Sequence, residues 1–540
     1  MMKLFSLFKV IYPLVLATSF AVSATTYSKF ECPGNITFGS NSRIMEYVKD
    51  YPDCTVMKGG LLIQDGVTSL MPLAKLQTII GPLRIIQTRD LWSLKGLDQL
   101  KYVESIEITN TSISDISFPN LQQLTGVTSA LDRQAEAFNS RFNAVEHSGK
   151  IIIEGNEYLT KLSTFDQITK ANEISINFNG QLSTISGFNN LTQVGCKVDI
   201  AWNDSLKQVE GFNRLQRVKE DGCKFDYLST LSFYENPKLT KLRGFSSLVH
   251  VSSLRLTGNE QLTSIANDTF SQLRTIDDIM LVDKTRLTEL SNFHNINSIG
   301  LNLMIQDNSE LTNLAGLEQL KLVNGVISID NNPKLADIMA LSGLKEVCGL
   351  EIDNEPKLTE LVSFSNITSL KKGLVLKNND KLESLTGFEH VTELSGPLDI
   401  ESNPDLASLS GLQHLNQQAS IESKASSISC DRGKLSNNLL YINDNDTLAS
   451  IDALSNYHAQ VISLQVNKNF SLSTLKGIEN ITLSKVPSQH SELKSSVIEN
   501  YNLADCSALC PVLRLGVDLT LSNYRGNCMD RSELICASAD

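Results

Sequence analysis

The sequence lacks a basic segment. Its 540 residues carry 47 Lys and Arg against 60 Asp and Glu, which gives a formal net charge of −13. Proteins that bind nucleic acid cluster cations to neutralise phosphates, so no nucleic-acid partner is expected. An acidic balance spread along the chain is typical of a soluble protein and specifies no partner by itself.

Long apolar runs are also scarce. The one candidate is 10–22, which follows Lys3 and Lys9 and ends in Val22-Ser23-Ala24. Small residues at that point suit signal peptidase, so 1–24 is predicted to be a cleaved secretory signal. A retained anchor is the alternative, although the run is short for one. We therefore expect no transmembrane span in the mature chain, and a secreted, periplasmic or surface-held location.

Signatures of catalysis are absent. The seven histidines show no His-x-x-x-His spacing, and no Gly-x-Ser-x-Gly elbow, phosphate-binding loop or dinucleotide fingerprint occurs. We therefore predict no catalytic residue, metal ligand or cofactor. Because carboxylates are abundant, a carbohydrate-active enzyme is kept as the last-ranked hypothesis.

What the sequence does contain is a repeat of about 24 residues. Its strongest part reads Leu-x-Ile-x-x-Asn-x-x-Leu, as at 254–262, 327–335 and 398–406. A fixed period of this size is typical of a solenoid. Leu-x-Ile is a short strand whose two apolar side chains face one way, and stacked coils would bury them against each other. Strands of successive coils should then pair in parallel, about 4.8 Å apart.

The asparagine of the repeat falls just after the strand, where the chain turns inward. A buried amide must be hydrogen-bonded, so stacked Asn side chains should bond backbone groups of their own and adjacent coils. We interpret them as a structural asparagine ladder rather than as catalytic residues. The predicted ladder consists of Asn156, Asn179, Asn203, Asn236, Asn259, Asn308, Asn332, Asn379, Asn403, Asn445 and Asn469.

Interruptions of the repeat suggest how the chain is divided. A helical pattern begins at Ala130, Cys223 lies in a second break, and a Ser-rich stretch surrounds Cys430. The predicted segments are a signal peptide (1–24), an N-terminal cap (25–60), first coils (61–125), a helical insertion (126–148), a main solenoid (149–485, with loop insertions at 219–229 and 417–436) and a cysteine-containing C-terminal cap (486–540).

The start of the mature chain carries a second signal. Cys32-Pro-Gly34 is followed by a helical stretch at 42–50 and then by Cys54-Thr-Val-Met-Lys-Gly-Gly-Leu-Leu-Ile63. This opening resembles the receptor L domain of insulin-receptor and EGF-receptor ectodomains, and similar repeats occur in fungal cell-wall and microbial surface proteins. The resemblance implies a mainly β fold, a right-handed single-stranded β-solenoid related to leucine-rich repeats. It also implies a Cys32–Cys54 disulfide and extracellular recognition without catalysis.

The other cysteines also suggest disulfides, because ten cysteines in an exported chain are expected to oxidise. Cys196 and Cys223 lie about one coil apart, which makes a bond between them plausible. Cys348 and Cys430 lie several coils apart, so either the 417–436 loop folds back to bring them together or both stay free. The C-terminal cap should hold two bonds, in a pairing that the sequence leaves open, among Cys506, Cys510, Cys528 and Cys536.

Two surface features are candidate ligand sites. Phe178 and Trp202 precede ladder asparagines on consecutive coils and should stack, near Tyr234 on the next coil. Such a ladder suits flat sugar faces or protein hot spots, whereas packing of the coil corner is the structural alternative. The second feature is an acidic stripe on the sheet face, formed by Asp283, Asp307, Asp330, Glu351, Asp353, Asp399 and Glu401.

The acidic stripe suits a basic partner or Ca²⁺; a solvated face that blocks aggregation of the sheet is the alternative.

Sequons form a third group of candidate sites, for glycosylation in a host that glycosylates. The acceptors expected to be accessible are Asn35, Asn190, Asn267, Asn366 and Asn480.

These features favour a secreted or cell-surface recognition protein without enzymatic activity. Its expected ligand is an extracellular protein or polysaccharide, bound on a solenoid face. The alternative, from another functional class, is a structural component of an extracellular wall or matrix.

Overall fold

The computed structural model describes residues 28–125, 149–218, 230–415, 430, 439–484, 493–513, 517–529, 534 and 536. The predicted signal peptide and the predicted insertions at 126–148 and 219–229 lie outside these ranges. Of the predicted loop at 417–436, only Cys430 is described. The predicted division of the chain into segments therefore stays a prediction.

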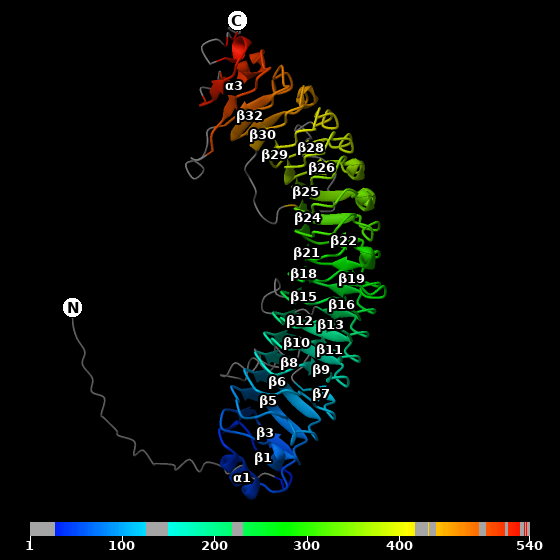
Figure 1. Ribbon diagram of the computed structural model, residues 1–540, viewed down its shortest axis with the longest axis vertical. Helices are drawn as coiled ribbons and strands as arrows, with labels where there is room; N and C mark the ends of the chain where they lie inside the picture. The colour runs from blue at the N-terminus through cyan, green and yellow to red at the C-terminus, as the bar shows by residue number, and fades with distance from the viewer. Residues whose placement is uncertain are drawn as a thin grey trace, which may run out of the picture.

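The described residues form a parallel β-solenoid of about 18 turns, so the predicted mainly β solenoid is confirmed. Figure 1 shows the coils stacked in one curved column, with the long sheet on the inner side of the curve. The longer strands of this sheet are β5 (Thr78–Ile86), β6 (Tyr102–Thr109), β8 (Lys150–Glu154), β10 (Lys170–Asn177), β12 (Gln193–Ala201), β15 (Thr230–Tyr234), β18 (Ser253–Thr257), β21 (Met280–Asp283), β23 (Leu303–Gln306), β24 (Leu322–Asp330), β25 (Glu346–Asp353), β27 (Gly373–Lys377), β29 (Leu398–Glu401), β30 (Leu439–Asn443) and β32 (Ser463–Asn467).

Shorter strands lie on the other parts of each coil. The long sheet is extended by β7 (Gln123–Leu124), β14 (Arg217–Val218), β17 (His250–Val251), β20 (Thr275–Ile276) and β22 (Ser298–Ile299). Two small pairs join β26 (Ser369–Leu370) to β28 (Glu393–Leu394) and β31 (Ala459–Val461) to β33 (Ile481–Leu483). On the outer side of the curve (Figure 1) lies a second parallel sheet of β9 (Lys161–Leu162), β11 (Thr184–Ile185), β13 (Gln208–Val209), β16 (Lys241–Leu242) and β19 (Ser264–Ile265).

The N-terminal cap closes the first coil. Helix α1 (Asn41–Asp50) begins after Ser40, whose hydroxyl accepts from the Arg43 backbone N–H at 3.4 Å. Strands β1 (Glu31–Pro33), β2 (Ile36–Phe38), β3 (Val56–Lys58) and β4 (Leu61–Ile63) join the long sheet. The predicted Cys32–Cys54 disulfide is present and links β1 to the segment before β3.

The core is built from the repeat as predicted. The two apolar residues of each strand point inward, as Leu254 and Leu256 do, and both are fully buried. A second column stands opposite them, because several units carry Phe at one fixed turn position. Its rings stack from coil to coil with centroids 4.8–5.6 Å apart over Phe165, Phe188, Phe212, Phe245, Phe270 and Phe293.

The asparagine ladder is confirmed, since all eleven predicted members are fully buried. Asn203 shows the pattern: its Nδ2 donates to Ile176 O at 2.8 Å and to Asn236 Oδ1 at 3.2 Å. Its Oδ1 accepts from the backbone and side-chain nitrogens of Asn179 at 3.0 and 3.3 Å. Each amide thus pairs backbone groups that the turn would otherwise bury unpaired.

The ladder has members that the repeat pattern did not predict. Thr111 and Thr285 take the ladder position in their coils, and each donates its hydroxyl to the next asparagine at 2.7 Å. In the coil of β25 the position is held by Glu355, fully buried, whose Oε1 accepts from the Asn332 backbone N–H and side chain at 2.9 and 2.8 Å. Its Oε2 has no hydrogen-bond partner.

The sheet and the ladder continue past residue 485, where the array was expected to end. Strand β34 (Ser496–Ile498) pairs in parallel with β32 and with β35 (Thr520–Ser522). Asn500 and Asn523 extend the ladder, and Asn500 Nδ2 donates to Asn523 Oδ1 at 3.1 Å. The last coils therefore lie within the segment expected to be the cap, together with the short helix α3 (Cys510–Leu513).

The residue just before each ladder position from Thr111 to Asn500 has a left-handed backbone. These residues have φ between 49° and 67°. The backbone N–H of such a residue can donate to the carbonyl at the end of the next strand. Phe178 N donates to Ala201 O at 3.1 Å, and Trp202 N donates to Tyr234 O at 3.0 Å. We call them the rim positions: Asn110, Gly155, Phe178, Trp202, Glu235, Gly258, Lys284, Asp307, Asn331, Asn354, Asn378, Ser402, Asp444, Lys468 and Glu499.

Removing one ladder amide should destabilise the protein strongly. Replacing Asn203 with Ala leaves the Ile176 carbonyl and the Asn179 N–H groups buried without that partner, so we expect a loss of about 3–5 kcal/mol in unfolding free energy. Chemical denaturation measures it. The exposed Asn297→Ala is the control, and an equal, small effect for both variants would contradict a structural ladder.

Glu355 should make stability depend on pH. Burial raises its pKa to about 8, although hydrogen bonds from Asn332 oppose the rise. The pKa of Glu355 in the folded state therefore exceeds the ordinary value of 4.5. Between pH 4.5 and about pH 8, the folded state keeps a proton on Glu355 that the unfolded state has lost. The contribution of this proton to the unfolding free energy is full below pH 4.5 and is lost as pH rises through about 8.

We therefore expect Glu355→Gln, which supplies an amide and cannot ionise, to flatten the fall in unfolding free energy between pH 5 and pH 9. The difference between the two proteins at pH 9 should be of the order of several kcal/mol. Glu360→Gln on the adjacent exposed turn is the control. Parallel stability–pH curves for wild type and Glu355→Gln would refute the assignment.

Candidate functional site

The expected aromatic stack is present. The rings of Phe178 and Trp202 lie nearly parallel, with centroids 4.7 Å apart and an interplanar angle of 5°. Tyr234 meets Trp202 edge-on, with centroids 4.8 Å apart and an angle of 89°. Phe178 is 55% exposed and Trp202 39% exposed, so the two rings pack on each other and not into the core.

The backbone of these two aromatics is strained. Phe178 has φ 57° and Trp202 has φ 52°, in a region where a bulky L-residue costs about 1–2 kcal/mol. Asn and Gly, which occupy many other rim positions, tolerate it much better. Large, strained and exposed side chains at consecutive positions are more typical of a binding surface than of structural filler.

A polar network lies on the sheet face next to the stack. Asn177 Nδ2 donates to Ser175 Oγ at 2.8 Å and approaches Asp199 Oδ2 at 3.3 Å, while Ser175 Oγ donates to Glu154 Oε1 at 2.8 Å. Asn177 Oδ1 accepts from the Ala201 N–H at 2.9 Å. The network fixes these side chains beside the aromatic rings and offers carboxylate acceptors to a ligand.

An ion-pair group borders this network. Glu173 contacts Lys150 at 2.7 Å and Lys197 at 3.3 Å. Burial alone would raise the pKa of Glu173, but the two lysines outweigh burial and the pKa is lowered. This edge of the site is therefore close to neutral.

The predicted acidic stripe is not one continuous feature. The register places Asp283, Asp330, Asp353 and Glu401 in one row at the strand ends, with Gln306 and Lys377 between them. Asp307 lies at a rim position, and Glu351 and Asp399 lie in mid-strand. Lys377 pairs with Asp399 at 2.8 Å and with Glu401 at 3.2 Å, so it neutralises the C-terminal end of the stripe.

The other carboxylates of the stripe repel each other. Burial raises the pKa of Asp330, and the charges of Asp353 and Asp307 raise it further. Burial, followed by the charge of Asp330, also raises the pKa of Glu351. Neutral amides hold part of the group, since Asn378 donates to Asp353 Oδ1 at 2.8 Å. Within the described ranges, no set of three or more His, Cys, Asp or Glu side chains is arranged to hold a metal ion.

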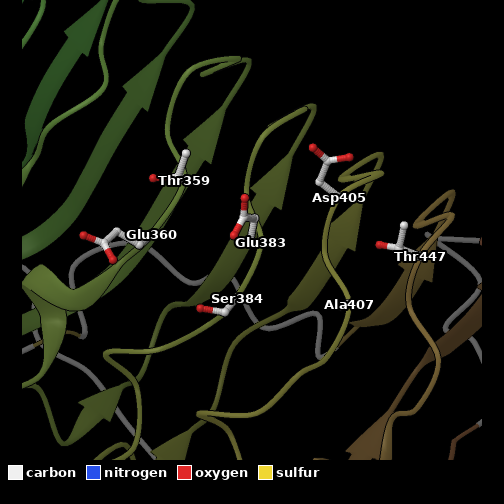
Figure 2. Close-up of a pocket in the computed structure, with 7 residues that line it drawn as sticks. All are labelled: Thr359, Glu360, Glu383, Ser384, Asp405, Ala407 and Thr447. Atoms are coloured by element: carbon white, nitrogen blue, oxygen red, sulfur yellow. The ribbon is translucent and has the colours of Figure 1, made fainter.

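A shallow groove lies on the turns that follow the ladder, far along the column from the aromatic stack. Its volume is about 490 Å³. Figure 2 shows that it crosses four coils, with lining residues Thr359, Glu360, Glu383, Ser384, Asp405, Ala407 and Thr447. Two of its polar groups are already engaged: Asp405 pairs with Lys381 at 2.8 Å, and the Thr447 hydroxyl donates to Pro404 O at 2.7 Å.

The disulfides settle what the sequence left open. Cys348 and Cys430 are bonded. The C-terminal bonds are Cys506–Cys528 and Cys510–Cys536. Cys196 is disulfide-bonded, but Cys223 lies outside the described residues, so the Cys196–Cys223 pair stays a prediction.

Sequence reasoning missed further exposed aromatics. Phe470, Tyr501 and Tyr524 each follow a ladder asparagine directly, on three consecutive coils. The rings of Tyr501 and Tyr524 stack, with centroids 4.5 Å apart and an interplanar angle of 3°. Nearer the N-terminus, the rings of Trp92 and Tyr158 contact each other, with centroids 5.1 Å apart. The signal for the first group was present as Asn-Phe and Asn-Tyr at 469, 500 and 523, but the last two positions fell in the expected cap.

The sequon asparagines divide by burial. Asn35, Asn267, Asn366 and Asn480 are exposed and Asn190 is partly exposed. The side-chain amides of Asn190, Asn366 and Asn480 each donate to a backbone carbonyl of the preceding coil at 2.8 Å. Their glycosylation stays a prediction.

Comparison with known proteins adds little. No family model matches the chain, and neither does any curated protein. Among solved structures, a leucine-rich repeat protein from Bacteroides thetaiotaomicron is similar at 12% sequence identity with a TM-score of 0.26. The similarity covers 87% of this chain and 51% of that chain, so this chain spans about half the length of that protein. A similarity with so low a TM-score carries no argument about function.

The fold and the repeat therefore define the class: a disulfide-bonded leucine-rich β-solenoid. Within the described ranges, no helix has both the length and the apolar character to cross a bilayer.

Lys377, which pairs with Asp399 and Glu401, should contribute to the stability of the protein. Asp399 is buried and its Oδ1 has no partner, so Lys377→Met should destabilise the protein by about 3–5 kcal/mol at pH 7. The loss should shrink at low pH, because burial raises the pKa of Asp399 and its unpaired carboxyl then takes up a proton more readily. Adding Asp399→Asn to Lys377→Met should recover part of it. The matched change at an exposed pair, Lys381→Met, should have little effect, and equal losses for Lys377→Met and Lys381→Met would contradict this account.

Proposed function

We propose that this protein is an exported, non-enzymatic recognition protein of the receptor L-domain type, which binds an extracellular protein or polysaccharide on the inner face of its solenoid. Leucine-rich solenoids commonly present such an extended concave surface to a partner. The disulfides are compatible with an oxidising, extracellular location. The single observation that carries the proposal is the strained, exposed stack of Phe178 and Trp202.

The site is preformed, which favours binding. The rim N–H groups of Phe178 and Trp202 are bonded into the sheet, and the ladder asparagines that follow them are fully buried. Little conformational freedom is then left to lose when a partner binds. Aromatic side chains held in this way are typical centres of binding energy.

A double substitution tests the proposal. Phe178→Ala/Trp202→Ala removes the rings and relieves the strained φ only in part, so the fold should persist with a small change in unfolding free energy. Binding to isolated cell walls, to insoluble polysaccharides and to extracellular proteins should be compared by co-sedimentation and pull-down. At least one partner of the wild type should bind the double variant 10-fold or more weakly.

The matched control is Phe470→Ala/Tyr501→Ala, which removes a second exposed aromatic group elsewhere. Full retention of every partner by Phe178→Ala/Trp202→Ala would overturn the assignment of this face. Folding of both variants is checked by their denaturation midpoints.

A further inference from the structure

The aromatic stack is open at one end. Phe178 has one ring face against Trp202 but is still 55% exposed, whereas Trp202, enclosed between Phe178 and Tyr234, is 39% exposed. The difference places the free ring face of the stack on the N-terminal side of Phe178. A flat ligand can add to the stack only there.

The coil on that side carries no bulky residue at its rim. Its rim position is Gly155, with φ 65°, so the rim of this coil places no side chain over Phe178. The next rim residue beyond it is Asn110, whose side chain leans over Gly155 and brings its oxygen 2.4 Å from the point where a Cβ at Gly155 would stand. Two coil steps, about 9.6 Å at 4.8 Å each, separate the backbones of Asn110 and Phe178. Between them the Asn110 side chain covers Gly155, while Phe178 stays largely exposed. We call the surface formed by Phe178, Gly155 and the Asn110 side chain the Gly155 notch.

Polar groups border the notch. The exposed amide of Asn110 is on one side. Glu154, the last residue of β8, carries a carboxylate that Ser175 and Asn177 hold through Oε1 at 2.8 and 3.4 Å. One aromatic face, an amide and an oriented carboxylate together form the usual chemistry for binding a sugar ring, which has C–H bonds on its faces and hydroxyls at its edge.

We propose that the Gly155 notch binds a neutral pyranose ring that stacks on Phe178, as one unit of a polysaccharide. This inference rests on the proposed function, because it assigns the ligand class of the same stack. A ring with equatorial hydroxyls fits best, because its faces carry only C–H bonds. A uronic acid is disfavoured by the carboxylate of Glu154, which Ser175 and Asn177 hold in place.

The test is a titration of the full chain with neutral hexasaccharides: β-1,4-glucan, β-1,3-glucan, β-1,4-mannan and chitin fragments, with oligogalacturonate as the anionic comparison. Calorimetry gives the affinity. Trp202 fluorescence in a Trp92→Phe background reports on the site, because the chain has only two tryptophans. We expect one or more neutral fragments to bind and oligogalacturonate to bind at least 10-fold more weakly.

Substitution at the notch separates this inference from the proposed function. Gly155→Asn introduces a residue that tolerates the left-handed backbone and adds a side chain next to the ring of Phe178. The oxygen that it would meet is the end of the exposed Asn110 side chain, which can move aside. We expect it to weaken sugar binding at least 10-fold without loss of fold. The matched control, Gly258→Asn, changes the other rim glycine, which has φ 67°, and should bind as wild type.

The ring itself is tested by Phe178→Leu, which keeps apolar bulk but removes the aromatic face, and by Phe178→Tyr, which keeps the face. Loss with Leu and retention with Tyr support stacking. Wild-type sugar affinity in Gly155→Asn, or no binding of any neutral fragment by the wild type, overturns the notch proposal. In either case a protein partner lost by Phe178→Ala/Trp202→Ala would still support the proposed function.

Discussion

After each strand of the long sheet the chain turns inward and would bury carbonyl and N–H groups that the sheet cannot pair. The column of ladder side chains pairs them. The asparagines bond backbone groups of adjacent coils, as Asn203 does with Ile176 O and the Asn179 N–H. Several also bond their own strand, as Asn179 Nδ2 does with Asn177 O. Because an unpaired buried polar group is so costly, the ladder fixes the path of the described coils from Thr111 onward, and the apolar core follows from that path.

The same constraint creates the binding surface. From Thr111 to Asn500, each ladder residue follows a residue with a left-handed backbone, which points its side chain away from the core at the edge of the sheet. Most coils place Asn, Gly or a charged residue there. Two coils place Phe178 and Trp202 there at a cost in backbone strain. The structural repeat and the candidate site are thus two consequences of one turn.

Much of the fold follows from the sequence alone. The spacing of the apolar pairs and asparagines predicted the coils, the ladder and the stack of Phe178 on Trp202. The pattern failed where a different chemical group replaces the ladder amide, as the Thr111 hydroxyl and the Glu355 carboxyl do. It also missed that Lys377 divides the acidic stripe, because the register between strands decides which charges meet.

Hydrogen bonds of the rim hold the aromatic stack in place. Amide hydrogen exchange at Phe178 and Trp202 measures this, since their N–H groups donate to Ala201 O and Tyr234 O. Both amides should exchange as slowly as those of the core strand residues Ile176 and Ile200. Fast, loop-like exchange at the two aromatics, with the strands still protected, would contradict it.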